Sequence, residues 1–112
     1  GLPGETKEMM MQTAKHIGNV GSHGIKLQLL HILKGTDLAT FYEGSGFNTL
    51  SETEYIDALC ECVLSLPNGT VLHRITGDAP KSLLVAPMWS ADKKRILQKI
   101  KDEFSHRNII LT

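Results

Sequence analysis

The segment from Val71 to Pro80 constrains the fold more than any other part of the sequence. It begins with β-branched and large apolar residues directly after a Pro-Asn-Gly turn signal, and this pattern predicts a strand. It ends at Thr76-Gly77-Asp78, where glycine frees the backbone and two short polar side chains can reach a ligand. Ligands of α/β proteins bind at the carboxyl ends of parallel strands, so the segment predicts part of a binding site. A strand followed by a plain turn is the simpler interpretation.

The rest of the chain alternates helices with strands. Predicted helices cover residues 6–20, 37–43, 51–66 and 91–106, and predicted strands cover 25–32 and 71–76, with a short extended segment at 83–86 and the start of a further strand at 109–111. The residues that predict helix starts are Thr6, Thr36 or Asp37, Ser51 with Glu54 as a capping box, and Ser90. This order predicts an α/β fold with a parallel sheet and right-handed crossovers. Because so few strands make a poor sheet alone, we expect a larger barrel around them, or a dimer through the exposed sheet edge.

Apolar residues at helical spacing predict the buried face of each long helix. For the first helix these are Met9, Met10, Thr13, Ala14, Ile17 and Val20. For the third they are Tyr55, Leu59, Cys62 or Val63, and Leu66, and for the last Ile96, Leu97, Ile100 and Phe104. In the strand at residues 25–32, alternation separates the apolar Ile25, Leu27 and Leu29 from Lys26 and Gln28. Lys26 and Gln28 therefore face either an exposed side of the sheet or the interior of an open barrel.

Two loops join Thr76-Gly77-Asp78 as candidate binding elements. The turn Gly1-Leu2-Pro3-Gly4 precedes a predicted helix, where backbone N–H groups and the helix dipole favour an anion. It lacks the Gly-Lys-Ser/Thr ending of a phosphate loop, so a plain turn also explains it. His31 lies at a strand end, ahead of Lys34-Gly35-Thr36, and is an acid, a base or a structural hydrogen-bonding residue.

Arg74 offers a planar fork for a carboxylate or a phosphate. His73 and Arg74 are neighbours in a predicted strand, so we expect their side chains to point to opposite faces. If Thr76 reaches the site, Arg74 lies on its side of the strand and His73 does not. The sequence shows no nucleophile elbow, no paired-carboxylate signature and no histidines at metal-ligand spacing, so it predicts no metal site and leaves the catalytic residues unknown.

The charge balance of the chain limits which classes of binding partner are expected. Twelve basic and twelve acidic residues cancel, which disfavours bulk attraction to nucleic acid or to anionic membranes. The basic run from Lys93 to Lys101 is more typical of a solvated helix face than of an RNA contact. No apolar run is long enough for a membrane span.

Cys60 and Cys62 are interpreted as structural thiols of a cytoplasmic protein. The chain opens on a turn without an initiator Met, so we expect it to be a piece of a longer protein.

These motifs together resemble the radical S-adenosylmethionine (SAM) enzymes. The first six residues, Gly-Leu-Pro-Gly-Glu-Thr, resemble the turn after the fourth strand of that superfamily. A narrower set is similar to bacterial radical SAM proteins described as predicted Fe–S oxidoreductases: Gly24-Ile25-Lys26-Leu27, Leu30-His31, Lys34-Gly35-Thr36, His73-Arg74, Thr76-Gly77-Asp78-Ala79-Pro80, Ala86-Pro87 and Trp89-Ser90. The resemblance extends over almost the whole chain, and the order of the motifs makes it specific.

The resemblance implies that residues 1–112 form the carboxy-terminal, incomplete part of a partial (β/α)6 TIM-like barrel. The strands near residues 25–32 and 71–76 would be its fifth and sixth, and the loops after them would share the barrel mouth. The cofactor-binding candidates are Gly1, Pro3, Gly4, Lys26, Gln28, His31, Arg74, Thr76 and Asp78. The full-length parent would hold a 4Fe–4S cluster and cleave SAM reductively to a 5′-deoxyadenosyl radical, which takes hydrogen from a substrate that the sequence does not name.

The cluster cysteines of this family lie in the amino-terminal part of the parent, and Cys60 and Cys62 do not have their spacing. We therefore expect these 112 residues alone to bind no cofactor and to be inactive, and their first partner to be the amino-terminal part of the same parent chain. The alternative is a freestanding small α/β binding module for an acidic metabolite or a protein partner.

Overall fold

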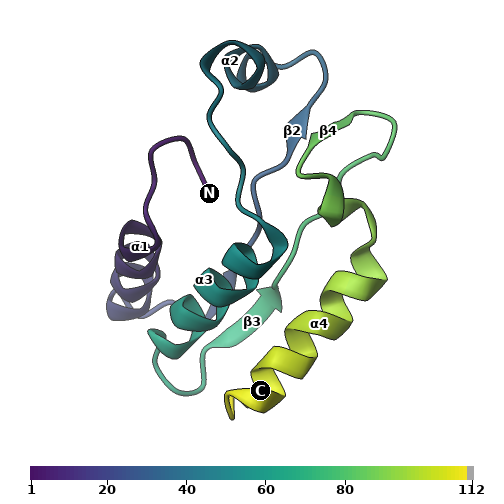
Figure 1. Ribbon diagram of the computed structural model, residues 1–112. Helices are drawn as coiled ribbons and strands as arrows, with labels where there is room; N and C mark the ends of the chain where they lie inside the picture. Colours follow the sequence, from purple (N-terminus) through teal and green to yellow (C-terminus); the bar gives the residue numbers. More distant parts are fainter. Residues whose placement is uncertain (111–112) are drawn as a thin grey trace.

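The computed structural model describes residues 1–110 (Figure 1). Its elements in chain order are α1 (Lys7–Asn19), β1 (Gly24–Lys26), β2 (Ile32–Leu33), α2 (Asp37–Ser45), α3 (Glu52–Leu64), β3 (Val71–Arg74), β4 (Leu84–Ala86), the 3-10 helix η1 (Met88–Ala91) and α4 (Lys93–His106). The predicted α/β class is confirmed. The described residues form a small α/β unit and do not by themselves make a barrel.

The strands form two separate two-stranded sheets. β1 and β3 pair in parallel, as predicted, and β2 and β4 pair antiparallel. The prediction of one continuous strand over residues 25–32 was wrong. The last ladder bond of β1 runs from the Leu27 N–H to the Arg74 carbonyl over 2.8 Å, and the chain then leaves β3 and reaches β4 only at Ile32. Alternation of side chains was right locally, but it does not reveal where the partner strand ends.

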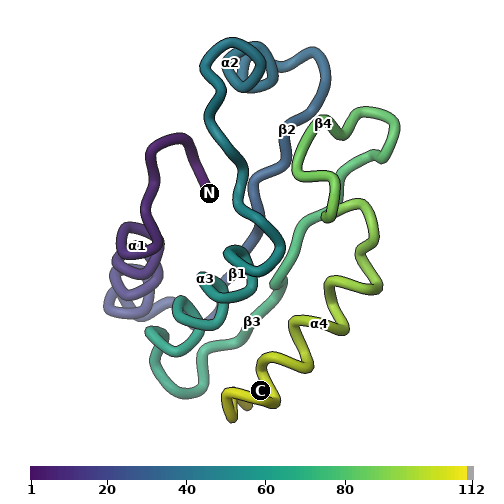
Figure 2. The backbone as a smooth tube through the Cα atoms, viewed as in Figure 1, coloured from purple at the N-terminus to yellow at the C-terminus, as the bar shows by residue number. Residues whose placement is uncertain are grey.

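Helices α3 and α4 cover one face of the β1–β3 pair (Figure 2). A single apolar cluster joins them: Leu29, Tyr55, Ile56, Leu59, Cys60, Ile96, Ile100 and Phe104 are its buried members, with Leu27, Leu72 and Ile75 packed against it. The predicted buried faces of these helices are largely confirmed. Of the four residues predicted to be buried on α4, three are buried and Leu97 is half-buried. The other face of the β1–β3 pair carries no helix in the described part of the chain.

Local capping explains where the helices begin. The Thr6 hydroxyl accepts from the Met9 N–H, the Thr36 hydroxyl accepts from the Ala39 N–H, and Ser51 forms the predicted capping box with Glu54. The prediction for the last helix was wrong, because Asp92 caps α4 and accepts from the Arg95 N–H. The Ser90 hydroxyl instead donates to the Pro87 carbonyl within η1, over 2.7 Å.

The predicted stripe on α1 was also partly wrong. Met9 and Val20 are exposed, and the buried positions are Ala14 and Gly18. Gly18 lies so close to Pro67 that an added Cβ would be 2.6 Å from its Cδ. The helix therefore packs against the end of α3 through small residues. A pattern of large apolar residues does not predict a contact of this kind.

A smaller unit, made of α2, β2 and β4, projects from one end of the body (Figure 1). Its apolar cluster contains Ile32, Ala39 and Ala86, with Tyr42 and Phe47 packed against them. The predicted extended segment near residues 83–86 is confirmed as β4. Residues 109 and 110 form no strand, and Leu111 lies outside the described residues. Among residues 1–110, none of the helices combines the length and apolar character that a membrane span requires.

Candidate functional site

The uncovered face of the β1–β3 pair is polar. Lys26, Gln28, His73 and Arg74 are all exposed, whereas Leu27 and Leu72 pack into the apolar cluster. The predicted split of residues 25–29 into an apolar face and a polar face therefore holds in β1 and just beyond it. The polar residues lie at the carboxyl ends of two parallel strands, where α/β proteins bind ligands.

The expectation that His73 and Arg74 point to opposite faces does not hold. Ile25 pairs with Leu72, but Lys26 pairs with Arg74, so β3 contains one extra residue, His73. Such a bulge interrupts the alternation of side chains. Both His73 and Arg74 are exposed, and the His73 ring lies against Gly24 so closely that a Cβ at Gly24 would collide with it. Both side chains are therefore available to the uncovered face.

The loops after β1 and β3 meet. A Cβ at Gly77 would lie 2.8 Å from Cε1 of His31, so glycine at this position lets the imidazole rest on the backbone. Thr76, next to Gly77, is a buried polar residue with an exposed fraction of 4%. The structure therefore brings His31 close to the segment that contains Thr76 and Asp78. These two residues follow His31 by 45 and 47 positions in the sequence.

The charged side chains where the two loops meet influence one another. Nζ of Lys93 donates to a carboxylate oxygen of Asp78 over 2.6 Å, and this bond, with the charges of Arg74 and His31, lowers the pKa of Asp78. Burial lowers the pKa of His31, and the negative charge of Asp78 partly opposes that shift. His31 is thus favoured in its neutral form, which can both donate and accept a hydrogen bond.

The glycine-rich turn at residues 1–4 lies close to the same end. Gly1 sits against the side chains of Leu50 and Leu30, the residue before His31. Pro3 and Gly4 are exposed, and Gly4 adopts a positive φ of 77°. Glu5 holds the turn, because its carboxylate accepts from the Leu2 N–H over 3.2 Å while its own N–H donates to the Leu2 carbonyl. Glu5 belongs to the motif identified from the sequence, but its role in holding the turn was not predicted.

A groove of about 570 Å³ runs along the edge of β1 that β3 does not occupy. It lies between α1, β1 and α3, and its wall is mainly apolar, from Met10, Ala14, Ile17, Ile25, Leu27 and Leu59, with Gly1, Lys26 and Gln28 also lining it. The unpaired edge of β1 therefore lies beside an apolar groove. The polar candidate residues Lys26 and Gln28 lie among the residues that line this groove.

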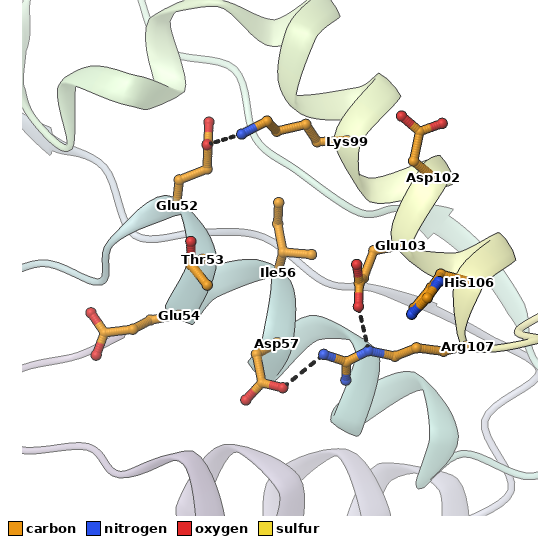
Figure 3. A pocket seen from close by; sticks show the side chains of 10 residues that line it. All are labelled: Glu52, Thr53, Glu54, Ile56, Asp57, Lys99, Asp102, Glu103, His106 and Arg107. Carbon is orange, nitrogen blue, oxygen red and sulfur yellow. Dashed lines mark hydrogen bonds and ion pairs between the residues drawn. The ribbon is translucent and has the colours of Figure 1, made fainter.

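A second groove, of about 690 Å³, lies between α3 and α4 (Figure 3). Its charged side chains are paired with one another: Arg107 with Asp57 over 2.9 Å and with Glu103 over 2.8 Å, and Lys99 with Glu52 over 2.6 Å. These pairs lower the pKa of Glu52, chiefly through Lys99, and that of Asp57, chiefly through Arg107. The groove is thus a seam of ion pairs joining two helices, and none of the candidates from sequence lies in it.

The cysteines do not form a metal site. Cys60 and Cys62 are buried in α3, and burial raises the pKa of each thiol, which disfavours the thiolate that binds iron. In the part of the chain that the structure describes, no three His, Cys, Asp or Glu side chains gather closely enough to hold a metal ion. These residues therefore do not fit an iron–sulfur cluster.

Comparison with known protein families decides the relationship. Residues 22–106 match the family model of the Radical_SAM C-terminal domain. The chain belongs to this family. The matched range contains both parallel strands, both strand-end loops and all of α4. The resemblance inferred from the motifs is therefore confirmed for the superfamily.

Individual relatives are longer than this chain. It is 41% identical over 107 residues to the uncharacterized protein YtqA of Bacillus subtilis, a match that takes in 96% of this chain and 33% of the relative. It is 33% identical over 93 residues to the protein YhcC of Escherichia coli K12, taking in 83% of this chain and 30% of the relative. An uncharacterized protein of Methanocaldococcus jannaschii is 32% identical over 108 residues, with 34% of its length matched. The chain thus spans about a third of the length of these relatives.

Membership of the radical SAM family implies SAM and a 4Fe–4S cluster in a full enzyme. The cluster does not fit the residues described, as shown above, whereas SAM does. SAM carries a carboxylate, an ammonium, ribose hydroxyls and a base edge. The uncovered face and the loop after β3 offer cations, an amide and a carboxylate for these groups, from Lys26, Arg74, Gln28 and Asp78.

Proposed function

We propose that this chain is the carboxy-terminal part of a radical SAM Fe–S oxidoreductase, and that its uncovered sheet face lines the enzyme's active site. The observation that carries the proposal is the meeting of the loops after β1 and β3, with His31 resting on Gly77 and electrostatically coupled to Asp78. Two strand ends that converge on charged side chains form the arrangement in which α/β proteins hold ligands.

We further propose that β1 and β3 are the fifth and sixth strands of a partial (β/α)6 barrel. The free edge of β1 would pair with a strand from the amino-terminal portion of the longer protein, seated in the apolar groove between α1 and α3. Three facts support this: within residues 1–110 β1 pairs on one edge only, the groove beside the other edge is mainly apolar, and the relatives are about three times as long. With that partner missing, the 112 residues alone would be inactive.

In this proposal each candidate has a limited task. Lys26, Gln28 and Arg74 would bind polar groups of SAM or substrate on the floor of the site, and Thr76 and Asp78 would do so at its rim. Gly1, Pro3 and Gly4 would close the neighbouring side, with Glu5 holding their turn in place. His31, favoured as neutral imidazole, would exchange hydrogen bonds without adding charge.

When bound in the whole protein, SAM and the cluster supply a 5′-deoxyadenosyl radical that abstracts hydrogen from the substrate. A site with this chemistry must exclude water and competing hydrogen donors, and buried Thr76 and the close His31–Gly77 contact help to seal one corner. We place the protein in the cytoplasm, where free thiols persist.

The test uses the whole protein, reconstituted anaerobically with iron and sulfide and reduced with dithionite. We expect 5′-deoxyadenosine to form, and Asp78→Asn to reduce its rate at least tenfold. Asp102→Asn, at an exposed position of α4 beside the ion-paired groove and outside the candidate site, is the matched control and should leave the rate unchanged. A full complement of cluster iron with no SAM cleavage would contradict the proposed function.

A further inference from the structure

Two cations occupy paired positions on the uncovered face. Lys26 of β1 and Arg74 of β3 are direct partners in the parallel ladder, and both side chains are exposed. Like charges at paired positions of neighbouring strands destabilise a sheet. The sequence keeps this unfavourable pair at the place where the two strand-end loops meet.

Neither cation is neutralised by a neighbour. Of the three arginines, Arg95 and Arg107 form ion pairs with helix carboxylates, whereas the guanidinium of Arg74 forms no hydrogen bond or ion pair within residues 1–110. Lys26 likewise has no such partner there. The helical surface of the molecule is thus rich in matched charges, and the uncovered sheet face is not.

The acidic group near Arg74 is already engaged. The charge of Arg74 acts on Asp78, but the carboxylate of Asp78 is hydrogen-bonded to Lys93 over 2.6 Å. The imidazoles of His31 and His73, which lie against Gly77 and Gly24, add no negative charge. The carboxylate of Glu5 lines the same groove as Lys26 and already accepts a hydrogen bond from the Leu2 N–H over 3.2 Å. Taken together, Lys26, Arg74, Lys93 and Asp78 leave an excess of positive charge on this face.

We propose that Lys26 and Arg74 form an oxyanion site, and that the anion is a carboxylate or phosphate group of the substrate. This inference rests on the proposed function and gives its unnamed substrate a chemical class. The guanidinium of Arg74 supplies a planar fork that binds two oxygens at once, and Lys26 adds a point charge beside it. Binding the anion also removes the repulsion between the two cations.

The same chemistry could serve the carboxylate of SAM, and the experiment separates the two sources. The whole reconstituted protein is titrated with inorganic phosphate by isothermal calorimetry, with and without SAM. We expect saturable binding of phosphate that persists when SAM is bound. We also expect Arg74→Gln and Lys26→Gln each to weaken it at least tenfold, and Arg74→Lys to be intermediate. Lys101→Gln, an exposed lysine on α4, is the control and should change nothing.

Phosphate that competes with SAM, together with an Arg74→Gln variant whose KM for SAM rises, would assign the site to the carboxylate of SAM and overturn the substrate assignment. Phosphate binding that is absent, or unaffected by both substitutions, would overturn the oxyanion site itself. The proposed function has a separate readout, because unaltered protein with an intact cluster either forms 5′-deoxyadenosine or does not, whatever phosphate does.

Discussion

The two faces of the β1–β3 pair have opposite chemistry. One face packs Leu27 and Leu72 against α3 and α4, and its side chains are fixed by apolar contact. The other presents the side chains of Lys26 and Arg74, which form no hydrogen bond or ion pair within residues 1–110. The apolar contacts on the first face supply stability, and the polar side chains on the second remain free for binding. The difference predicts that substitutions on the first face change stability, and substitutions on the second change function.

The sharpest test of this contrast is Ile100→Ala. Ile100 is fully buried in the cluster between α4 and the sheet, so its truncation removes apolar burial and leaves a cavity. We expect a loss of about 3–4 kcal/mol in the free energy of unfolding, measured by urea denaturation. Lys26→Ala on the uncovered face should cost less than about 0.5 kcal/mol. Equal losses for the two variants would mean that the faces do not differ as described.

Tyr55→Phe tests the link between the covered face and the site. The Tyr55 hydroxyl donates to the Ile75 carbonyl over 2.7 Å, just before the buried Thr76, and burial raises the pKa of that hydroxyl. Its removal leaves a carbonyl without a partner, so we expect a loss of about 1.5 kcal/mol by the same measurement. Tyr42→Phe is the control, since the Tyr42 hydroxyl has no hydrogen bond in the described chain. A loss no larger than that of the control would refute the link.

Gly77→Ala sharpens the comparison at the edge of the site. The new methyl would lie 2.8 Å from the His31 ring, which must move, and we expect a cost of about 1 kcal/mol. Gly44→Ala, inside α2 where a Cβ meets nothing within 4 Å, should instead stabilise by about 0.5 kcal/mol. Chemical shifts of His31 should change in the first variant only. An unmoved His31 resonance would argue against the contact.

The smallest expected effect is on the titration of His31. Burial lowers its pKa from the ordinary 6.5, so the unfolded chain takes up the proton more readily. Stability from this group is therefore complete above pH 6.5 and declines as the pH falls toward the lower folded value. Asp78→Asn removes the opposing negative charge and should lower the NMR titration midpoint of His31 further, whereas Glu43→Gln on α2 should not. A midpoint that rises in Asp78→Asn would contradict the coupling.

Features encoded within a few residues were predictable from the sequence. The capping box at Ser51 and Glu54 needs only a local turn of helix, and so does the cap at Thr6. The split between Lys26 and Leu27 follows from alternation alone. Features that depend on a distant partner were not predictable in this way. The early end of β1 is set by where β3 stops, and the exposure of both His73 and Arg74 is set by a bulge in pairing.

In the candidate site, too, local features were predictable and features that depend on a distant partner were not. Its residues were selected because they follow strands, and the structure brings His31 and Gly77 into contact, as strand-end reasoning requires. Two features were not foreseen. Asp78 is engaged by Lys93 of α4, and Glu5 holds the glycine-rich turn. The first is an ion pair between groups 15 positions apart, and the second is a side-chain bond to the backbone within one turn. A one-dimensional pattern specifies neither partner.

We propose above that the uncovered face is where the whole protein meets SAM and substrate. Hydrogen exchange of the whole reconstituted protein, followed by mass spectrometry with and without SAM, measures this directly. We predict slower exchange in residues 24–31 and 71–80 and no change in the outer part of α4. Protection confined to the ion-paired groove between α3 and α4, with none at the strand ends, would contradict it.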